Sequence, residues 1–159
     1  FEVDLAAIAF GQGMTTTPLQ LARATAAIAN DGKLIDMPLV ERIVNDRGDV
    51  IEERKPEMVR QVVSAEVARQ VREMMALVVG QGGTGTLASV PGFRVAGKTG
   101  TAQKVDPVTG GYSVDKRVAS FIGMVPAEKP QLVVVVEIDE PSKQVYGGLV
   151  AAPDRKSVV

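Results

Sequence analysis

Apolar positions in the second half of the chain follow a short-period pattern. Segments 93–104, 117–125 and 131–139 carry alternating or continuous apolar residues, which favours β-strands. The two connections between them show no helical periodicity, whereas parallel neighbours need a crossover that is usually helical. The pattern therefore predicts an antiparallel meander. Residues 132–136 read LVVVV, apolar on both faces, as expected of a central strand covered by helices.

Two other segments have the spacing of helices that bury one face. The first, 18–29, has Thr17 before it as a cap and Pro18 at its first position, and it ends before the turn sequence NDG. The second runs from Ser64 to about residue 79. Between them, 39–54 alternates around a polar turn, which predicts a surface β-hairpin. The predicted fold class is α+β, an antiparallel sheet flanked by helices.

Composition narrows the chemistry more than it narrows the fold. The 159 residues are enough for one domain, and a net charge of −1 gives no electrostatic reason to expect nucleic acid as a partner. Histidine and cysteine are both absent, which excludes histidine acid–base catalysis, thiolate nucleophiles, disulfides and the usual zinc ligands. Catalysis would have to use Ser, Thr, Lys, Asp, Glu, Tyr or backbone groups.

The stretch GFRVAGKTGTAQ, residues 92–103, matches two motifs that need different chemistry. Residues 92–99 fit G-x-x-x-x-G-K-[ST], the phosphate loop of nucleotide hydrolases, and LVVVVEID at 132–139 resembles their Mg²⁺-holding strand. A phosphate loop must open into a helix whose N-terminus faces the anion. Here strand-favouring residues fill the loop, and the GTAQKVDP that follows cannot start a helix. A nucleotide hydrolase is therefore only a remote alternative.

The second motif is K-T-G at 98–100, a signature of penicillin-binding proteins and serine β-lactamases. On a strand, alternation places Lys98 with Gly100 on one face and Thr99 with Thr101 on the other. These side chains could meet one ligand only at an edge position or a local twist. Gly100 would let a substrate backbone come close, and an extended peptide could then pair with the strand. An exposed N–H on this strand could stabilise an oxyanion.

Six separated segments resemble the transpeptidase domain of class B penicillin-binding proteins, in the order in which that family has them. They are AFGQG (9–13), TPLQLA (17–22), ANDG (29–32), AGKTGTAQ (96–103), SFIG (120–123) and AAP (151–153). The resemblance implies part of the fold shared by penicillin-binding proteins and serine β-lactamases. It also implies a peptidoglycan D,D-transpeptidase, which cross-links stem peptides through a serine ester formed from D-Ala-D-Ala, without metal or organic cofactor.

The resemblance further implies roles for the K-T-G strand. Lys98 would support proton transfer and the electrostatics of the site, and Gly100 would lie beside the substrate. The hydroxyls of Thr99 and Thr101 would bind the carboxylate of the stem peptide or of a β-lactam antibiotic. The backbone N–H of Thr101 would form half of the oxyanion hole, and the N–H of the nucleophilic serine the other half.

The serine motifs of the family are the part of its pattern that the chain does not match. S-x-N is absent, and S-x-x-K occurs once, from Ser113 to Lys116, after K-T-G and not before it. The nucleophile and its lysine must lie one helical turn apart, whereas Ser113 is expected in a loop between strands. We therefore expect 1–159 to be the C-terminal portion of a single transpeptidase domain from a longer protein, unable to be acylated alone.

Other interpretations stay open beside this one. A D,D-carboxypeptidase, a β-lactamase or a β-lactam sensor would share K-T-G, and a non-catalytic binding module would fit a chain without the serine. The expected partners are the D-Ala-D-Ala stem peptide and β-lactams, with no nucleic acid. By resemblance, the domain works outside the cytoplasmic membrane, which it contacts only through an N-terminal anchor that the printed sequence lacks.

The C-terminus also departs from the family. After AAP the family continues with an apolar residue and a helix that covers the sheet, whereas this chain has the polar sequence DRKS at 154–157. The departure predicts that the helix is cut short or that the last residues are not native. The sheet face beneath should then be exposed or paired with a second copy of the chain.

Overall fold

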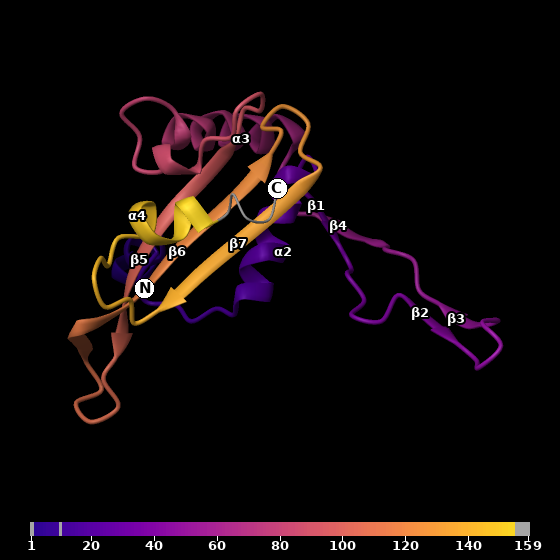
Figure 1. Ribbon diagram of the computed structural model, residues 1–159, viewed down its shortest axis with the longest axis horizontal. Coiled ribbons are helices and arrows are strands. Elements are labelled where there is room, and N and C mark those ends of the chain that lie inside the picture. Colours follow the sequence, from indigo (N-terminus) through magenta and orange to yellow (C-terminus); the bar gives the residue numbers. More distant parts are fainter. Residues whose placement is uncertain (1, 10, 155–159) are drawn as a thin grey trace.

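The computed structural model describes residues 2–9 and 11–154, and its centre is a three-stranded antiparallel sheet with helices on both faces (Figure 1). The strands are β5 (Ala96–Val105), β6 (Tyr112–Val125) and β7 (Leu132–Asp139), in the order β5-β6-β7. Both pairs are antiparallel. The predicted meander and the α+β class are therefore confirmed.

Strand β7 lies on the outer side of this sheet, whereas its apolar sequence predicted a central strand. The apolar residues of β7 are explained by the helices that cover the two faces of the sheet. On one face Val133 packs against the same buried cluster as Ile28 of α2 (Pro18–Ala29). On the other, Val136 packs against a cluster that contains Ala151 of α4 (Gly147–Asp154). A strand needs apolar residues on both faces when helices cover both, whatever its position in the sheet.

The two long helices have the ends that the sequence predicted. Helix α2 begins with a capping box, in which the Thr17 hydroxyl accepts from the Gln20 N–H and the Gln20 side chain accepts from the Thr17 N–H. Helix α3 (Ala65–Val79) begins with Ser64 as its cap. The buried guanidinium of Arg72 donates to Asp31 (2.9 Å) and ties α3 to the turn that ends α2.

Figure 1 shows a two-stranded ribbon that projects away from the sheet and its helices. Its base pairs β1 (Lys33–Ile35) with β4 (Met58–Gln61), and its outer part pairs β2 (Arg42–Val44) with β3 (Val50–Glu53). The outer part is the hairpin predicted over 39–54. Every residue of β2 and β3 is exposed. The outer part of the ribbon therefore adds no side chain to the core.

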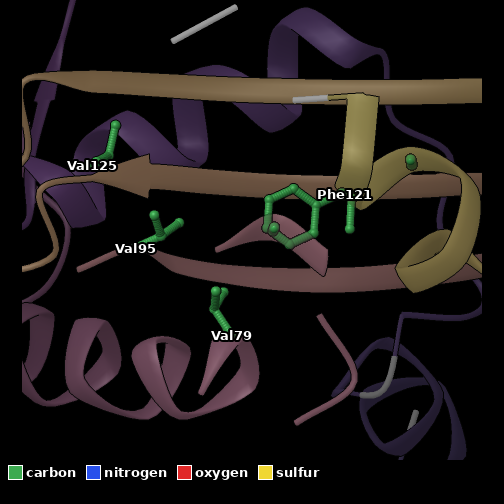
Figure 2. Close-up of a cluster of buried hydrophobic side chains, with 7 residues drawn as sticks. Val79, Val95, Phe121 and Val125 are labelled. Carbon is green, nitrogen blue, oxygen red and sulfur yellow. The ribbon is translucent and has the colours of Figure 1, made fainter. Parts of the chain in front are cut away.

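The core on the α4 side of the sheet surrounds Phe121, which has no exposed surface (Figure 2). Val79 from the end of α3 and Val95 from just before β5 lie beside its ring. Gly97 lies under the ring, and a Cβ at this position would collide with it. This packing fixes the start of β5, one residue before the K-T-G motif.

Three helical segments had no clear signal in the sequence: α1 (Glu2–Ala9), the short 3₁₀ helix η1 (Thr86–Ala88) and α4. Helix α4 includes the AAP segment and lies against β6 and β5, with Ala151 and Ala152 fully buried. The face predicted to be uncovered is thus covered at its centre. Phe10 and the polar residues 155–157 lie outside the described residues, and self-association through this face stays a prediction.

Candidate functional site

The K-T-G residues lie on β5, the outer strand opposite β7. An edge position is one of the two that would let Lys98 and both threonines contact the same ligand. An outer strand also leaves alternate backbone groups without a strand partner. Lys98 is exposed, whereas Thr99, Gly100 and Thr101 are half-buried. The motif therefore forms one accessible edge of the sheet.

Thr99 is held by a second threonine from a distant loop. The hydroxyls of Thr84 and Thr99 lie 2.9 Å apart, close enough for a hydrogen bond in which either can donate. Gly148, at the start of α4, packs on this pair, and a Cβ there would collide with the Thr84 carbonyl oxygen. Three segments, the loop after α3, strand β5 and helix α4, therefore meet at Thr99.

Thr101 is held by the backbone of α4. The Gly147 N–H donates to Thr101 Oγ1, with 3.2 Å between N and Oγ1. A Cβ at Gly147 would collide with the carbonyl oxygens of Gly100 and Ser120, so only glycine brings this N–H so close to β5. Since a hydroxyl has one proton and two lone pairs, Thr101 can still donate its proton to another acceptor. Both threonine hydroxyls lie on the α4 side of β5, as alternation predicted.

Lys98 reaches along the strand. Its Nζ donates to the carbonyl oxygen of Thr99 at 2.6 Å, and the side chain is exposed. The ammonium group therefore lies against the backbone of β5 at Thr99, although the Lys98 Cβ starts on the face opposite the threonine hydroxyls. Its long flexible stem makes this possible.

Gly100 has a packing role that the sequence did not reveal. A Cβ at Gly100 would collide with the hydroxyl of Ser120, its partner on β6. From the sequence, we expected a glycine here because it would let a substrate backbone approach the strand. Its neighbour inside the sheet gives it a second reason, independent of any ligand.

An ion-pair cluster lies where β5 and β7 end, on the side of the sheet away from the start of β5. Lys104 Nζ lies 2.9 Å from Asp139 Oδ1 and 2.8 Å from Glu140 Oε1, so it links β5 to the end of β7. The hydrogen bonds to Asp139 and then to Glu140 raise the pKa of Lys104. The hydrogen bond from Lys104 lowers the pKa of Glu140 below its ordinary value. The cluster holds the strand ends and lies apart from the threonines.

Ser113, the serine of the one S-x-x-K match, lies on β6, not in the loop that the sequence predicted. Strand β6 begins at Tyr112, earlier than expected, because 112 pairs with Val105 across the turn. Ser113 Oγ accepts from the backbone N–H of Lys116, while Lys116 Nζ pairs with Glu140 at 3.5 Å. This serine and lysine therefore do not share a helical turn.

The phosphate-loop interpretation is wrong. Residues 96–105 form one continuous strand, so the chain leaves Thr99 as a strand and no helix begins there. Among the described residues, no group of three or more acidic side chains could hold a metal ion. Helices long and apolar enough to cross a membrane are likewise lacking in the part of the chain that the structure describes.

The structure adds three site residues that the sequence analysis missed: Thr84, Gly147 and Gly148. The sequence showed only a glycine-rich segment after α3 and a Gly-Gly pair near the C-terminus. Nothing in a single sequence joins positions 15 or 46 residues apart along the chain. Only the packing of α4 and the loop onto β5 brings them to the motif.

Two cavities of about 200 and 190 Å³ have no K-T-G residue in their lining. The first lies between α3 and residues 127–128, where the cationic side chains of Arg69, Arg72 and Arg94 are all paired with carboxylates. The second lies between the end of α2 and the start of β7. The K-T-G residues line neither of these two cavities.

Comparison with known proteins gives one consistent family. A family model described as the penicillin binding protein transpeptidase domain matches residues 1–158. The chain is 39% identical to the probable peptidoglycan D,D-transpeptidase PenA of Neisseria flavescens, over 99% of this chain and 36% of that protein. It is 40% identical to stage V sporulation protein D of Bacillus subtilis, over 95% of this chain and 23% of that protein. The chain therefore spans about a third or less of these relatives.

Solved structures agree. Penicillin-binding protein 3 of Mycobacterium tuberculosis superposes with a TM-score of 0.83 and 35% identity, over 97% of this chain and 38% of that one. The same protein has been solved in complexes with aztreonam and with ampicillin.

Proposed function

Because the chain belongs to the penicillin-binding protein transpeptidase family, we propose that it is the K-T-G part of a peptidoglycan D,D-transpeptidase. The protein that contains it would cross-link stem peptides by serine acyl transfer from D-Ala-D-Ala, and would bind β-lactams. The observation that carries the proposal is the edge of β5, where the Thr99 and Thr101 hydroxyls share one face and the Lys98 ammonium group bonds to the Thr99 carbonyl oxygen. Hydroxyl donors and a cation on one strand suit the terminal carboxylate of D-Ala-D-Ala.

The reaction would proceed in two balanced steps. A serine Oγ attacks the carbonyl carbon between the two D-alanines, its proton passes to the leaving amine, and the terminal D-Ala departs. An amine of a second stem peptide then attacks the serine ester, so that an amide forms and the serine regains its proton. Lys98 would favour the proton transfers and the negative charge that develops. The Thr101 N–H would donate to the oxyanion.

The chain would form one wall of the site. Its Lys98 is exposed on an outer strand of the sheet, so the serine, its lysine and the S-x-N motif would come from the segment that faces β5 in the longer protein. We accordingly propose that 1–159 is the C-terminal portion of one transpeptidase domain. That domain would work on the outer side of the cytoplasmic membrane, where peptidoglycan is assembled.

The test is covalent labelling. We expect the full-length parent protein to form a denaturation-resistant adduct with a fluorescent penicillin, and the isolated chain to form none. Lys98→Met in the parent should lower the second-order rate constant of acylation by about 100-fold or more, the usual range for a proton-transfer group. An adduct on the isolated chain, or an unchanged rate in Lys98→Met, would contradict the proposal.

Product analysis separates the related activities. A stem-peptide donor supplied with an amine acceptor should give a cross-linked amide. Release of D-Ala without cross-linking would indicate a carboxypeptidase, and rapid hydrolysis of the penicillin adduct a β-lactamase.

A further inference from the structure

Thr84, in the loop after α3, contacts a threonine of the K-T-G strand through its hydroxyl. Its Oγ1 lies 2.9 Å from Thr99 Oγ1, and it is exposed on the same side of the sheet as the open edge of β5. It belongs to no motif found in the sequence. Its hydroxyl therefore needs an explanation of its own.

The loop that carries Thr84 is anchored on both sides. The Gly83 N–H donates to the Gly80 carbonyl and the Gly85 N–H to the Val78 carbonyl, at 3.0 and 2.9 Å. A Cβ at Gly83 would collide with the end of α3, and Gly85 is buried beside the Phe121 ring. These hydrogen bonds and close contacts hold the loop that carries the Thr84 hydroxyl in place.

The partners of Thr99 and Thr101 determine whether their hydroxyl protons are available to a ligand. A carboxylate only accepts hydrogen bonds, so a hydroxyl that binds it must donate its single proton. Thr101 is prepared for this, because the Gly147 N–H already occupies one of its acceptor positions. Thr99 would be prepared in the same way if Thr84 donates to it. The two hydroxyls would then present two protons to one side.

We propose that Thr84 is a positioning residue for carboxylate recognition. Its hydroxyl donates to Thr99 Oγ1, fixes the Thr99 rotamer, and leaves the Thr99 proton for the carboxylate of the substrate. This inference rests on the proposed function, because it needs a carboxylate at β5. It goes beyond that proposal by assigning a role to a residue that does not touch the reacting atoms.

The experiment compares two probes in the full-length parent protein: benzylpenicillin and its methyl ester, which lacks the carboxylate charge. Thr84→Val, which keeps the side-chain shape, should lower the second-order acylation rate constant for the acid by about threefold to tenfold, the usual effect of one hydrogen bond. For the ester the change should stay within about twofold, since a neutral ester gains little from the oriented proton. Thr84→Ser should restore the rate with the acid.

A double-mutant cycle with Thr99→Val separates this role from a structural one. If Thr84 acts through Thr99, Thr84→Val should add no further loss in the Thr99→Val background. Equal losses with acid and ester, or additive losses in the cycle, would overturn the inference. If Thr99→Val itself leaves acylation by the acid unchanged, the proposed carboxylate site on β5 fails. If Thr99→Val slows acylation and Thr84→Val does not, only the role of Thr84 fails.

Discussion

The sheet β5–β7 and the ribbon β2–β3 are both antiparallel and both come from alternating sequence, yet they differ in what they bury. Phe121, Met124 and Ala119 of β6 are buried almost completely, whereas every residue of β2 and β3 is exposed. Helices cover both faces of the sheet, whereas within residues 2–9 and 11–154 no helix packs extensively on the outer ribbon (Figure 1). Alternation therefore predicts strands, but burial depends on a second layer that the local pattern does not contain.

The comparison also separates two kinds of glycine. Gly147 lets α4 approach the sheet at Gly100 and Ser120, and Gly148 lets it approach the loop at Thr84, because a Cβ at either glycine would strike a backbone oxygen. Gly48, at the tip of the ribbon, has a φ of +86° and open space around its Cβ position. The first two are needed for packing between elements, and the third for a local turn.

The largest expected contrast between the two regions is in core stability. Phe121→Ala should lower the free energy of unfolding of the chain by about 3–5 kcal/mol, because it leaves a cavity under α4. The matched ribbon change, Ile51→Ala, should cost less than about 0.5 kcal/mol, because Ile51 is 68% exposed. Urea denaturation of both variants gives the two values. Similar losses would mean that the ribbon is packed in solution.

A smaller contrast should appear at the glycines. Gly147→Ala should cost about 1–3 kcal/mol, because α4 must move away from β5 to accommodate the methyl group. The same movement breaks the bond from the Gly147 N–H to Thr101 Oγ1, so acylation of the parent protein should slow as well. Gly48→Ala should cost about 1 kcal/mol through backbone strain and leave acylation unchanged. The proposed coupling between α4 and the site fails if acylation in Gly147→Ala equals that of the wild type.

The Lys104 cluster predicts a pH-dependent effect that is smaller again. The pKa of Glu140 is lowered in the folded state, so its contribution to stability is present above its unfolded value, near 4.5, and is lost as the pH falls through the folded pKa. The pKa of Lys104 is raised, so its contribution is present below 10.5 and is lost as the pH rises through the folded pKa. The stability difference between wild type and Lys104→Met should therefore be largest between these limits.

Thermal unfolding at pH 3, 7 and 11 measures this difference. The ribbon provides the control, because Arg54 pairs with Glu52 two residues away and links no distant elements. Arg54→Met should change the unfolding temperature little at any of these values. A Lys104→Met difference that is the same at acid and neutral pH would exclude the ion pairs as its source.

The smallest effect is expected from shortening the ribbon itself. Replacing residues 41–54 by an Asn-Gly turn removes no buried side chain, so the free energy of unfolding should change by less than about 1 kcal/mol. Penicillin acylation of the parent protein should keep its rate, because the ribbon lies away from β5. A large loss of either would show that the ribbon contributes to the domain in a way that its exposure does not reveal.

Most of the local structure followed from the sequence. The capping residues and 3.6-residue spacing gave α2 and α3 with ends close to those observed, because these signals act within one or two turns. The strands of the meander were also predicted, with errors at their ends: β6 begins at Tyr112, because the turn before it pairs more of the chain than the pattern indicated. Helix α4 was missed, because a short Gly-Gly-Leu-Val-Ala-Ala segment has no polar face to create periodicity.

The sequence by itself determined which chemistry was available and on which strand it would lie. The absence of histidine and cysteine, the K-T-G motif, and the alternation that puts Thr99 and Thr101 on one face all follow from residue identities and a period of two. Tertiary structure alone decided how those threonines are held. Thr84 and Gly147 reach them only after a loop and a helix pack onto β5, since hydrogen bonds between distant segments depend on the whole fold and leave no local signal.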